Sequence, residues 1–127
     1  MRGYDGGMTE TGAEPTVFER IAAGEIPAKI VAETERVIAF HDIAPQAPVH
    51  VIVAPRSAEH RDVVELAAAD PGLMAELVEV ANRVASELAD GQFRLVFNTG
   101  PRAGQTVFHV HAHVLAGGLR EGSLVGG

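Results

Sequence analysis

The sequence contains no cysteine and no tryptophan, and it has few aromatic residues of any kind. Without cysteine the chain can form neither disulfide bonds nor zinc sites built on thiolates. Because aromatic residues make up only 5% of the chain, its 46% of hydrophobic residues must build a core mainly from valine, leucine, isoleucine and alanine. No apolar run approaches the roughly 20 residues that a membrane-spanning helix requires, so we expect no membrane partner.

Positive charge is also scarce, since 10 lysine and arginine residues face 17 acidic ones and give a formal net charge of −7. This balance argues against a nucleic-acid partner held by a basic surface, although it permits a small anionic ligand in a local pocket. The start of the chain lacks the apolar segment of a signal peptide. These absences together predict a cytoplasmic protein.

The length of 127 residues suits a single domain. Residues 1–15 are polar and glycine-rich, which predicts a disordered leader, and Met8 offers an alternative start within it. The part of the chain with a clear apolar pattern covers residues 16–118. Residues 119–127 are expected to form an exposed C-terminal tail.

The first helix is predicted from its capping residues. Thr16 and Glu19 are spaced as a capping box, which favours a helix of about two turns that ends near Gly24. Val63–Ala69 is a candidate for a further short helix.

The long helix of the chain is predicted to begin at Asp70 and Pro71, because these residue types are typical of an N-cap and a first helical position. It should end near Gly91. Apolar residues recur along it at three- and four-residue spacing, which indicates an amphipathic helix. They are Leu73, Leu77, Ala81, Val84 and Leu88, and Met74, Val78 and Ala85 widen the stripe.

The remaining apolar segments are typical of strands. Val49–Ala54 is apolar except for His50, which predicts a central strand covered on both faces. In Arg36–Asp42 only one alternation can face the core, and we assign Ile38 and Phe40 to it, which places Asp42 on the same side. The pattern predicts an α+β domain with a five-stranded, mostly antiparallel sheet, one long helix and one short helix. The predicted strands are Lys29–Glu33, Arg36–Asp42, Val49–Ala54, Phe93–Asn98 and His109–Leu115.

The last predicted strand carries three histidines that alternate with small apolar residues. His109, His111 and His113 therefore share one face, with successive side chains roughly 6.6 Å apart. Neutral imidazoles are costly to bury without partners, so a row of this kind indicates a site. A loop with two glycines and a hydroxyl, Thr99–Thr106, comes just before the row.

Two chemistries use such a row of imidazoles. One is a metal site, to which Asp42 or His50 could add a further ligand. The other is nucleophilic catalysis on phosphorus, in which one imidazole attacks the phosphate and forms a covalent intermediate. Gly100, Gly104 and Thr106 favour the second, because backbone amides and a hydroxyl suit an anion site. We therefore expect neither a metal nor another cofactor.

The segment His109–Leu115 has the pattern His-φ-His-φ-His-φ-φ, in which φ is apolar, and resembles the signature of the histidine triad (HIT) superfamily. The resemblance covers the domain from about Thr16 to Gly118, and it implies a HIT-like fold and a homodimer. Three further segments are similar to the nucleotide-binding, Hint-type branch: Phe18–Lys29, Ala39–His50 and Asn98–Val107.

The resemblance also implies a role for each histidine. His111 would attack the α-phosphorus of a nucleotide, with its ring oriented by the carbonyl of His109. His113 would contact the phosphoryl oxygens, and His50 would support the triad from behind. Asp42 would accept hydrogen bonds from the ribose hydroxyls, because a carboxylate offers two acceptors. The implied nucleotide-binding residues are Phe18, Ile26, Phe40 and Ile43 around the base, Asn98, Gln105 and Thr106 on the phosphate and leaving-group side, and Gly104 and Val107 beside them.

The resemblance implies a hydrolase that cleaves purine nucleoside phosphoramidates, or related nucleoside monophosphate conjugates, through a covalent nucleotidyl-histidine intermediate. Two alternatives are a hydrolase of dinucleoside polyphosphates and a nucleotide-binding protein with a mainly protein-interaction role. A metal-dependent cupin-like protein is disfavoured by the long helix, because cupins are all-β. The tail Leu119–Gly127 lacks the Trp-Pro-Pro-Gly-like ending of many eukaryotic relatives, so the leaving-group preference is left open. The absence of cysteine also argues against the structural zinc that some relatives hold.

Overall fold

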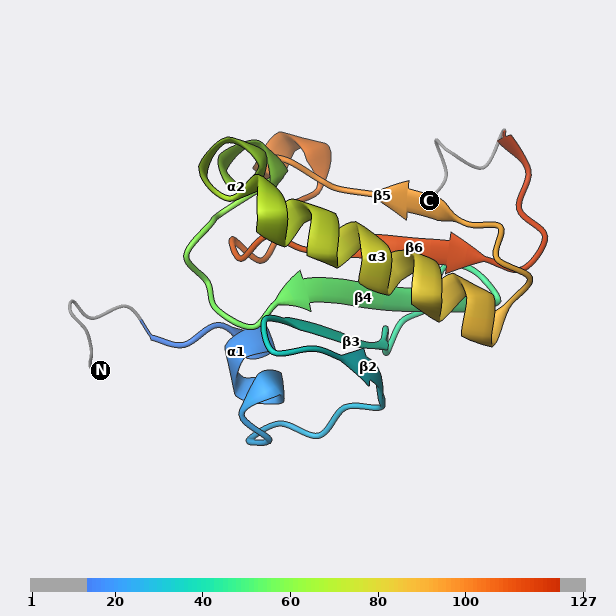
Figure 1. Cartoon of the computed structure of the whole chain (residues 1–127), viewed down its shortest axis with the longest axis horizontal. Helices are drawn as coiled ribbons and strands as arrows, with labels where there is room; N and C mark the ends of the chain where they lie inside the picture. Colours follow the sequence, from blue (N-terminus) through green and yellow to red (C-terminus); the bar gives the residue numbers. More distant parts are fainter. Residues whose placement is uncertain (1–13, 122–127) are drawn as a thin grey trace.

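The computed structural model describes residues 14–121, which form a five-stranded sheet with helices on both faces (Figure 1). The strand order is β2-β3-β4-β6-β5, and every neighbouring pair is antiparallel. The predicted α+β class and antiparallel sheet are therefore confirmed. The strands are β2 (Ile30–Glu33), β3 (Val37–His41), β4 (Val49–Pro55), β5 (Arg94–Val96) and β6 (Ala112–Ala116).

The expected leader and tail fall largely outside this range, since residues 1–13 and 122–127 are not among the described residues. Within residues 14–121, no helix combines the length and the apolar character needed to cross a membrane.

Both predicted helix starts are found. The Thr16 side chain accepts a hydrogen bond from the Glu19 N–H, and the Glu19 carboxylate accepts one from the Thr16 N–H, so the capping box is complete. Asp70 caps the long helix by accepting from the Leu73 N–H. The candidate at residues 63–69 is also helical, which gives two short helices beside the long one. The helices are α1 (Val17–Ala22), α2 (Val63–Ala69), α3 (Pro71–Leu88) and the short 3₁₀ helix η1 (Pro101–Ala103).

The long helix α3 crosses one face of the sheet (Figure 1). Its buried stripe differs from the five main residues of the predicted one at three positions, one of which is the buried Ala85. Leu88, in the last turn, is exposed, whereas Val80 is buried because it follows Leu77 by three residues and precedes Val84 by four. Burying a side chain of this size contributes about 1.5–3 kcal/mol relative to leaving it in water. The strands and the segment just before β6 contribute to the same cluster. Their residues in it are Val37, Ala39, Val51, Val53, Val110, Ala112 and Val114.

The opposite face of the sheet is covered by α1. Phe18 and Ile21 of this helix pack with Ile38, Phe40, Ile52 and Ala54 of the strands. The expectation that only one alternation of β3 faces a core is therefore wrong, because Val37 and Ala39 face α3 while Ile38 and Phe40 face α1. The prediction for β4 is confirmed: it is the middle strand, and its residues from His50 to Pro55 are buried.

Four strands are shorter than predicted, and the difference bears on the site in β6 and β5. β6 begins at Ala112, so His109 and His111 lie in the segment before it. The ladder with β4 stops at the pair Val53–Ala112, because Pro55 has no N–H to donate and its carbonyl accepts from the His109 ring. β5 is likewise limited to Arg94–Val96 within the predicted range of residues 93–98.

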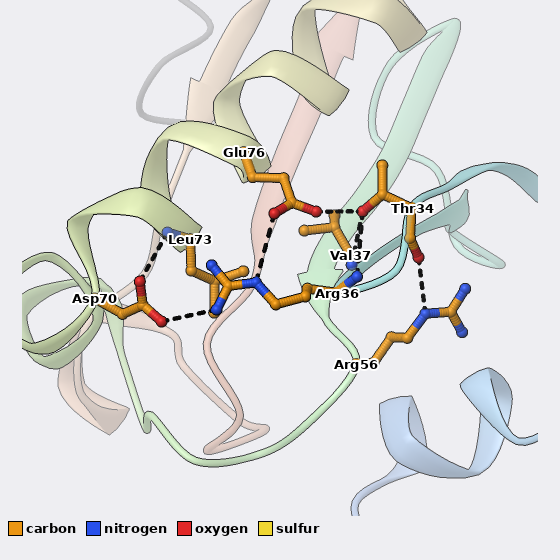
Figure 2. A network of polar contacts seen from close by, with 7 residues as sticks. All are labelled: Thr34, Arg36, Val37, Arg56, Asp70, Leu73 and Glu76. Atoms are coloured by element: carbon orange, nitrogen blue, oxygen red, sulfur yellow. Dashed lines mark hydrogen bonds and ion pairs between the residues drawn. The ribbon is translucent and has the colours of Figure 1, made fainter.

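A polar network on the α3 side joins the β2–β3 hairpin to the long helix (Figure 2). The Arg36 guanidinium donates to Asp70 at 3.0 Å and lies 3.5 Å from Glu76. The Thr34 hydroxyl donates to the Glu76 carboxylate and accepts from the Val37 N–H, while the Arg56 Nε–H donates to the Thr34 carbonyl. We call these side chains the hairpin–helix network.

Candidate functional site

The histidines predicted to form the site meet on the α1 face of the sheet. His113 lies in β6 opposite Ile52, and His50 lies two residues before Ile52 on β4, so the pleat directs both side chains to one face. The ring centroids of His50 and His113 are 5.1 Å apart, and those of His111 and His113 are 5.2 Å apart. The row thus continues from β6 into the segment before it.

The His111 ring has a defined orientation. Its Nδ1 lies 2.9 Å from the His109 carbonyl oxygen, which can only accept, so Nδ1 carries the proton and donates. In a neutral imidazole this leaves the lone pair on Nε2, the nitrogen that can act as a nucleophile. Burial lowers the pKa of His111, against the opposing effect of this hydrogen bond, and so favours the neutral ring.

A chain of hydrogen bonds also fixes the proton positions of His50 and His113. The Gln46 backbone N–H donates to His50 Nδ1 at 2.9 Å, so the proton of neutral His50 is on Nε2. His50 Nε2 lies 2.9 Å from His113 Nδ1 and donates to it, which leaves the proton of His113 on Nε2. The Nε2–H of His113 is therefore a donor at the end of this row of hydrogen bonds, where it could meet an oxygen of a ligand.

The surroundings of these hydrogen-bonded histidines keep their rings neutral. Burial, reinforced by the neighbouring His111 and His50, lowers the pKa of His113 to about 4. Burial also lowers the pKa of His50, although the Asp42 carboxylate, 3.4 Å from His50 Nε2, acts in the opposite direction. At neutral pH both rings are therefore available as hydrogen-bond partners without a positive charge.

Asp42, His50 and His113 also form the cluster that a metal ion would require, because their ligand atoms lie within 4.8 Å of one another. A metal would need lone pairs on His50 Nε2 and His113 Nδ1. The Gln46 N–H occupies the other lone pair of His50 and so places a proton on its Nε2. The hydrogen-bond pattern thus fits neutral imidazoles in a proton-ordered chain better than it fits metal ligands.

The glycine loop is shaped by a buried glutamine. Gln105 is only 3% exposed, and its amide nitrogen donates to the carbonyls of Arg61 and Val107 at 2.7 and 3.1 Å. Its amide oxygen accepts from the Gly100 N–H at 2.8 Å. Both donors are therefore used inside the protein, so the predicted phosphate contact would require one of these bonds to be exchanged. The side chain instead braces the loop against the segment before α2.

The other loop residues lie nearer the surface. Gly100 and Gly104 have φ values of 90° and 95°, which L side chains rarely adopt, so the loop needs glycine at both positions. Thr106 is exposed, and Asn98 is partly buried with its amide next to Gly104. These residues lie where the sequence places them, at the start and end of one loop, and their ligand contacts stay predictions.

The residues predicted around the base fall into two groups. Phe18 and Phe40 are buried, with ring centroids 5.7 Å apart, and Phe18 also lies 4.8 Å from the His111 ring. Ile26 and Val107 pack against the same cluster. By contrast, Ile43 is 99% exposed. Asp42 and Ile43 line an open cavity of about 630 Å³ together with Pro27, Ala28, Lys29 and His41.

Two contributors to the site had no sequence signal of their own. Gln46 acts through its backbone N–H, which any residue except proline would supply. Thr16, predicted only as a helix cap, places its hydroxyl 2.6 Å from His109 Nδ1, although 93 residues separate the two in the chain.

A row of buried and half-buried, oriented imidazoles on an antiparallel sheet defines this chain as a histidine triad protein, and comparison with known proteins leads to the same class. Residues 23–118 match the family model of the HIT domain. The chain is 47% identical over 109 residues to an uncharacterized HIT-like protein of Synechocystis sp., covering 83% of this chain and 92% of that one.

Solved structures agree. A HIT family hydrolase from Clostridium thermocellum is similar with a TM-score of 0.78 and 40% identity, covering 86% of this chain and 98% of that chain. A hypothetical histidine triad nucleotide-binding protein from Sulfolobus tokodaii is similar with a TM-score of 0.65 and 31% identity, over 77% of this chain and 66% of the other. The protein belongs to the HIT family, and the resemblance seen in its sequence is confirmed.

Proposed function

We propose that this protein is a hydrolase that cleaves purine nucleoside phosphoramidates, or related nucleoside monophosphate conjugates, through a nucleotidyl intermediate on His111. The observation that carries the proposal is the hydrogen bond from His111 Nδ1 to the His109 carbonyl. It leaves Nε2 as a free nucleophile, and burial keeps the ring neutral by lowering its pKa. The hydrolase named among the similar structures supports the general class of reaction.

The reaction would proceed in two displacements at phosphorus. In the first, the lone pair of His111 Nε2 forms a bond to the α-phosphorus, and the bond from phosphorus to the amine nitrogen breaks. The amine leaves with the electron pair and takes a proton from water. In the second, a water oxygen bonds to phosphorus, the bond to Nε2 breaks, and the water releases a proton to solution. His111 returns to its neutral form, with Nδ1 still held by the His109 carbonyl.

The phosphoryl oxygens gain charge in both displacements, and His113 would stabilise them. The hydrogen bonds from Gln46 to His50 and from His50 to His113 end at Nδ1 of His113. Its Nε2–H, on the other side of the ring, is therefore the donor that this part of the site offers. Asn98, Gly104 and Thr106 would add donors from the loop, whereas Gln105 would act by holding the loop in shape.

The nucleoside would extend from the triad toward the open cavity beside β3. Asp42 Oδ1 accepts from the Ala44 N–H at 2.7 Å, and its remaining lone pairs suit the vicinal hydroxyls of a ribose. The base would lie near Phe18, Ile26, Phe40 and Ile43, close to the partly buried Val107. The nucleotide-binding protein named among the similar structures supports this class of ligand.

A turnover screen tests the proposal. Nucleoside 5′-phosphoramidates that differ in amine and base should be hydrolysed far above background, and a diadenosine polyphosphate should react more slowly. Acid quenching should trap a nucleotidyl adduct on the peptide that contains His111, and exhaustive chelation should leave the rate unchanged. A preference for the polyphosphate would favour the first alternative, whereas binding without turnover would favour an interaction role. An adduct on another residue, or rescue by zinc after chelation, would refute the mechanism.

We also propose that the protein is a homodimer with a two-fold axis. β5 forms one edge of the sheet, and Val78 on α3 remains 38% exposed, so strand edge and apolar helix surface are available for an isologous contact. Light scattering at micromolar concentration should give the mass of a dimer, and a monomeric mass would contradict this part of the proposal.

A further inference from the structure

The hydroxyl of Thr16 has two partners, one in its own helix and one in the triad. Its oxygen accepts from the Glu19 N–H at 3.1 Å, which is the ordinary contact of an N-cap. It also lies 2.6 Å from His109 Nδ1. The first contact explains why a threonine begins α1. The second has no part in capping and joins this helix to the row of histidines.

The proton positions in this contact follow from the other side of the His109 ring. His109 Nε2 lies 2.7 Å from the Pro55 carbonyl oxygen, which can only accept, so Nε2 carries a proton. His109 is fully buried, and burial lowers its pKa, so the ring is neutral and Nδ1 holds a lone pair. The Thr16 hydroxyl must therefore donate to Nδ1. Every polar atom of this buried ring is then satisfied.

This arrangement matters because the β4–β6 ladder does not extend to the segment before β6. His109 and His111 precede the strand and have no ladder partners there. The Val110 N–H donates to the His60 carbonyl at 3.0 Å. The side chain of His109, which Thr16 and Pro55 hold by hydrogen bonds, is a second anchor of this stretch. The His109 carbonyl, in turn, is the group that orients the His111 ring.

The same helix touches the triad through a second residue. Phe18, two positions after Thr16, packs in T-shaped geometry with the rings of His109 and His111, whose centroids are 5.3 and 4.8 Å away. Capping by Thr16 and packing by Phe18 therefore act together, since the cap sets where α1 begins and hence where Phe18 lies.

We propose that Thr16 is a positioning residue for this site. Its hydroxyl holds the His109 ring, the held His109 fixes its own carbonyl, and that carbonyl keeps His111 protonated on Nδ1 with Nε2 free. The effect on turnover rests on the proposed function, whereas the effect on the tautomer of His111 does not.

The first test is nitrogen NMR of the histidine rings in the free protein. In the wild type, His109 should be protonated on Nε2 and His111 on Nδ1. Thr16→Val, which removes the hydroxyl but keeps the shape, should shift the His109 Nδ1 resonance and increase the His111 population protonated on Nε2. Thr16→Ser should resemble the wild type. A wild-type spectrum with a proton on His109 Nδ1 would overturn the proposal without any variant having to fold.

The second test is kinetic, with a nucleoside 5′-phosphoramidate as the probe. Because Thr16 would act on geometry and touches no substrate, Thr16→Val should lower kcat by about ten- to a hundredfold with little change in KM. Thr16→Ser should restore the rate. Glu19→Ala is the matched control, since it removes the other half of the capping box and the contact to the Ala58 N–H but leaves the hydroxyl of Thr16 in place.

The outcomes distinguish a failure of the Thr16 proposal from a failure of the proposed function. Equal kcat for Thr16→Val and Glu19→Ala, with an unchanged His111 tautomer, would overturn the role of Thr16 while the proposed function stands. If the wild type hydrolyses no phosphoramidate, the proposed function fails, and the NMR result still decides whether Thr16 orients the triad.

Discussion

The histidine site and the hairpin–helix network both consist of polar, titratable side chains, but these side chains differ in charge. Each joins segments that are distant in the sequence through titratable side chains. In the network, Arg36 holds the pKa of Asp70 below its usual value, and both groups are solvated. In the site, burial lowers the pKa of the histidines, so they stay neutral.

The difference shows how surroundings decide what an ionisable group does. Where water is present, charged partners attract weakly and are screened by salt, so they help to align the hairpin with α3 and do little else. Where water is excluded, charge is disfavoured, and an imidazole keeps a lone pair and a proton at defined nitrogens. Those are the properties that nucleophilic catalysis needs.

The largest effect that separates the two regions should come from His111→Asn. The variant should fold and bind a nucleoside monophosphate, because the rest of the cluster is intact, but it should show no measurable turnover without Nε2. Steady-state assays, circular dichroism and calorimetric titration with a nucleoside monophosphate check the three statements. A rate close to that of the wild type would remove His111 from the mechanism.

A smaller loss is expected along the chain of hydrogen bonds. His113→Ala removes one donor to the phosphoryl oxygens, which typically lowers the rate by about 10²–10³. His50→Ala should lower it less, because His50 acts through His113. The kcat values of both variants, with KM measured alongside, test this order. A slower His50 variant would mean that His50 has a role of its own.

Acid should weaken the protein mainly through the site. Histidines in the unfolded chain titrate near 6.5, whereas the pKa of His113 in the folded protein is about 4. The unfolded state therefore binds more protons between these values, and stability is fully present above pH 6.5 and is lost as the pH falls toward 4. Asp70 also has a lowered pKa, but its contribution is lost only below about pH 4.

Urea unfolding across this pH range measures the difference. His113→Asn should make the decline of the unfolding free energy with falling pH less steep, whereas Asp70→Asn should leave the steepness between about pH 4 and 6.5 unchanged. A decline that is the same in wild type and His113→Asn would mean that His113 titrates normally in the folded protein.

The smallest effect should come from the hairpin–helix network. Arg36→Ala should leave kcat unchanged and lower the melting temperature by only a few degrees, and the difference should shrink in about 1 M salt. A double-mutant cycle with Glu76→Gln isolates the contribution of the pair. A loss of activity in Arg36→Ala would show that the two regions are coupled through the sheet.

Much of the fold could be predicted from residues that are neighbours in the chain. The capping residues Thr16 and Asp70 mark the helix starts, because an N-cap bonds to a residue only three positions away. The apolar run at residues 49–54 indicates the middle strand for a similarly local reason. The shorter β6 and the two buried faces of β3 could not be predicted, because they depend on Pro55 and on α1, which meet these strands only in the folded chain.

By itself, the sequence determined the elements, the absence of thiol chemistry and the identity of the four histidines, since each of these follows from composition or from short periodic patterns. Only the tertiary structure decided where the protons of those histidines reside. The Pro55 carbonyl, the Thr16 hydroxyl and the Gln46 N–H each meet a ring nitrogen from another segment of the chain. A tautomer depends on which donor or acceptor faces each nitrogen, and packing between distant segments sets that arrangement.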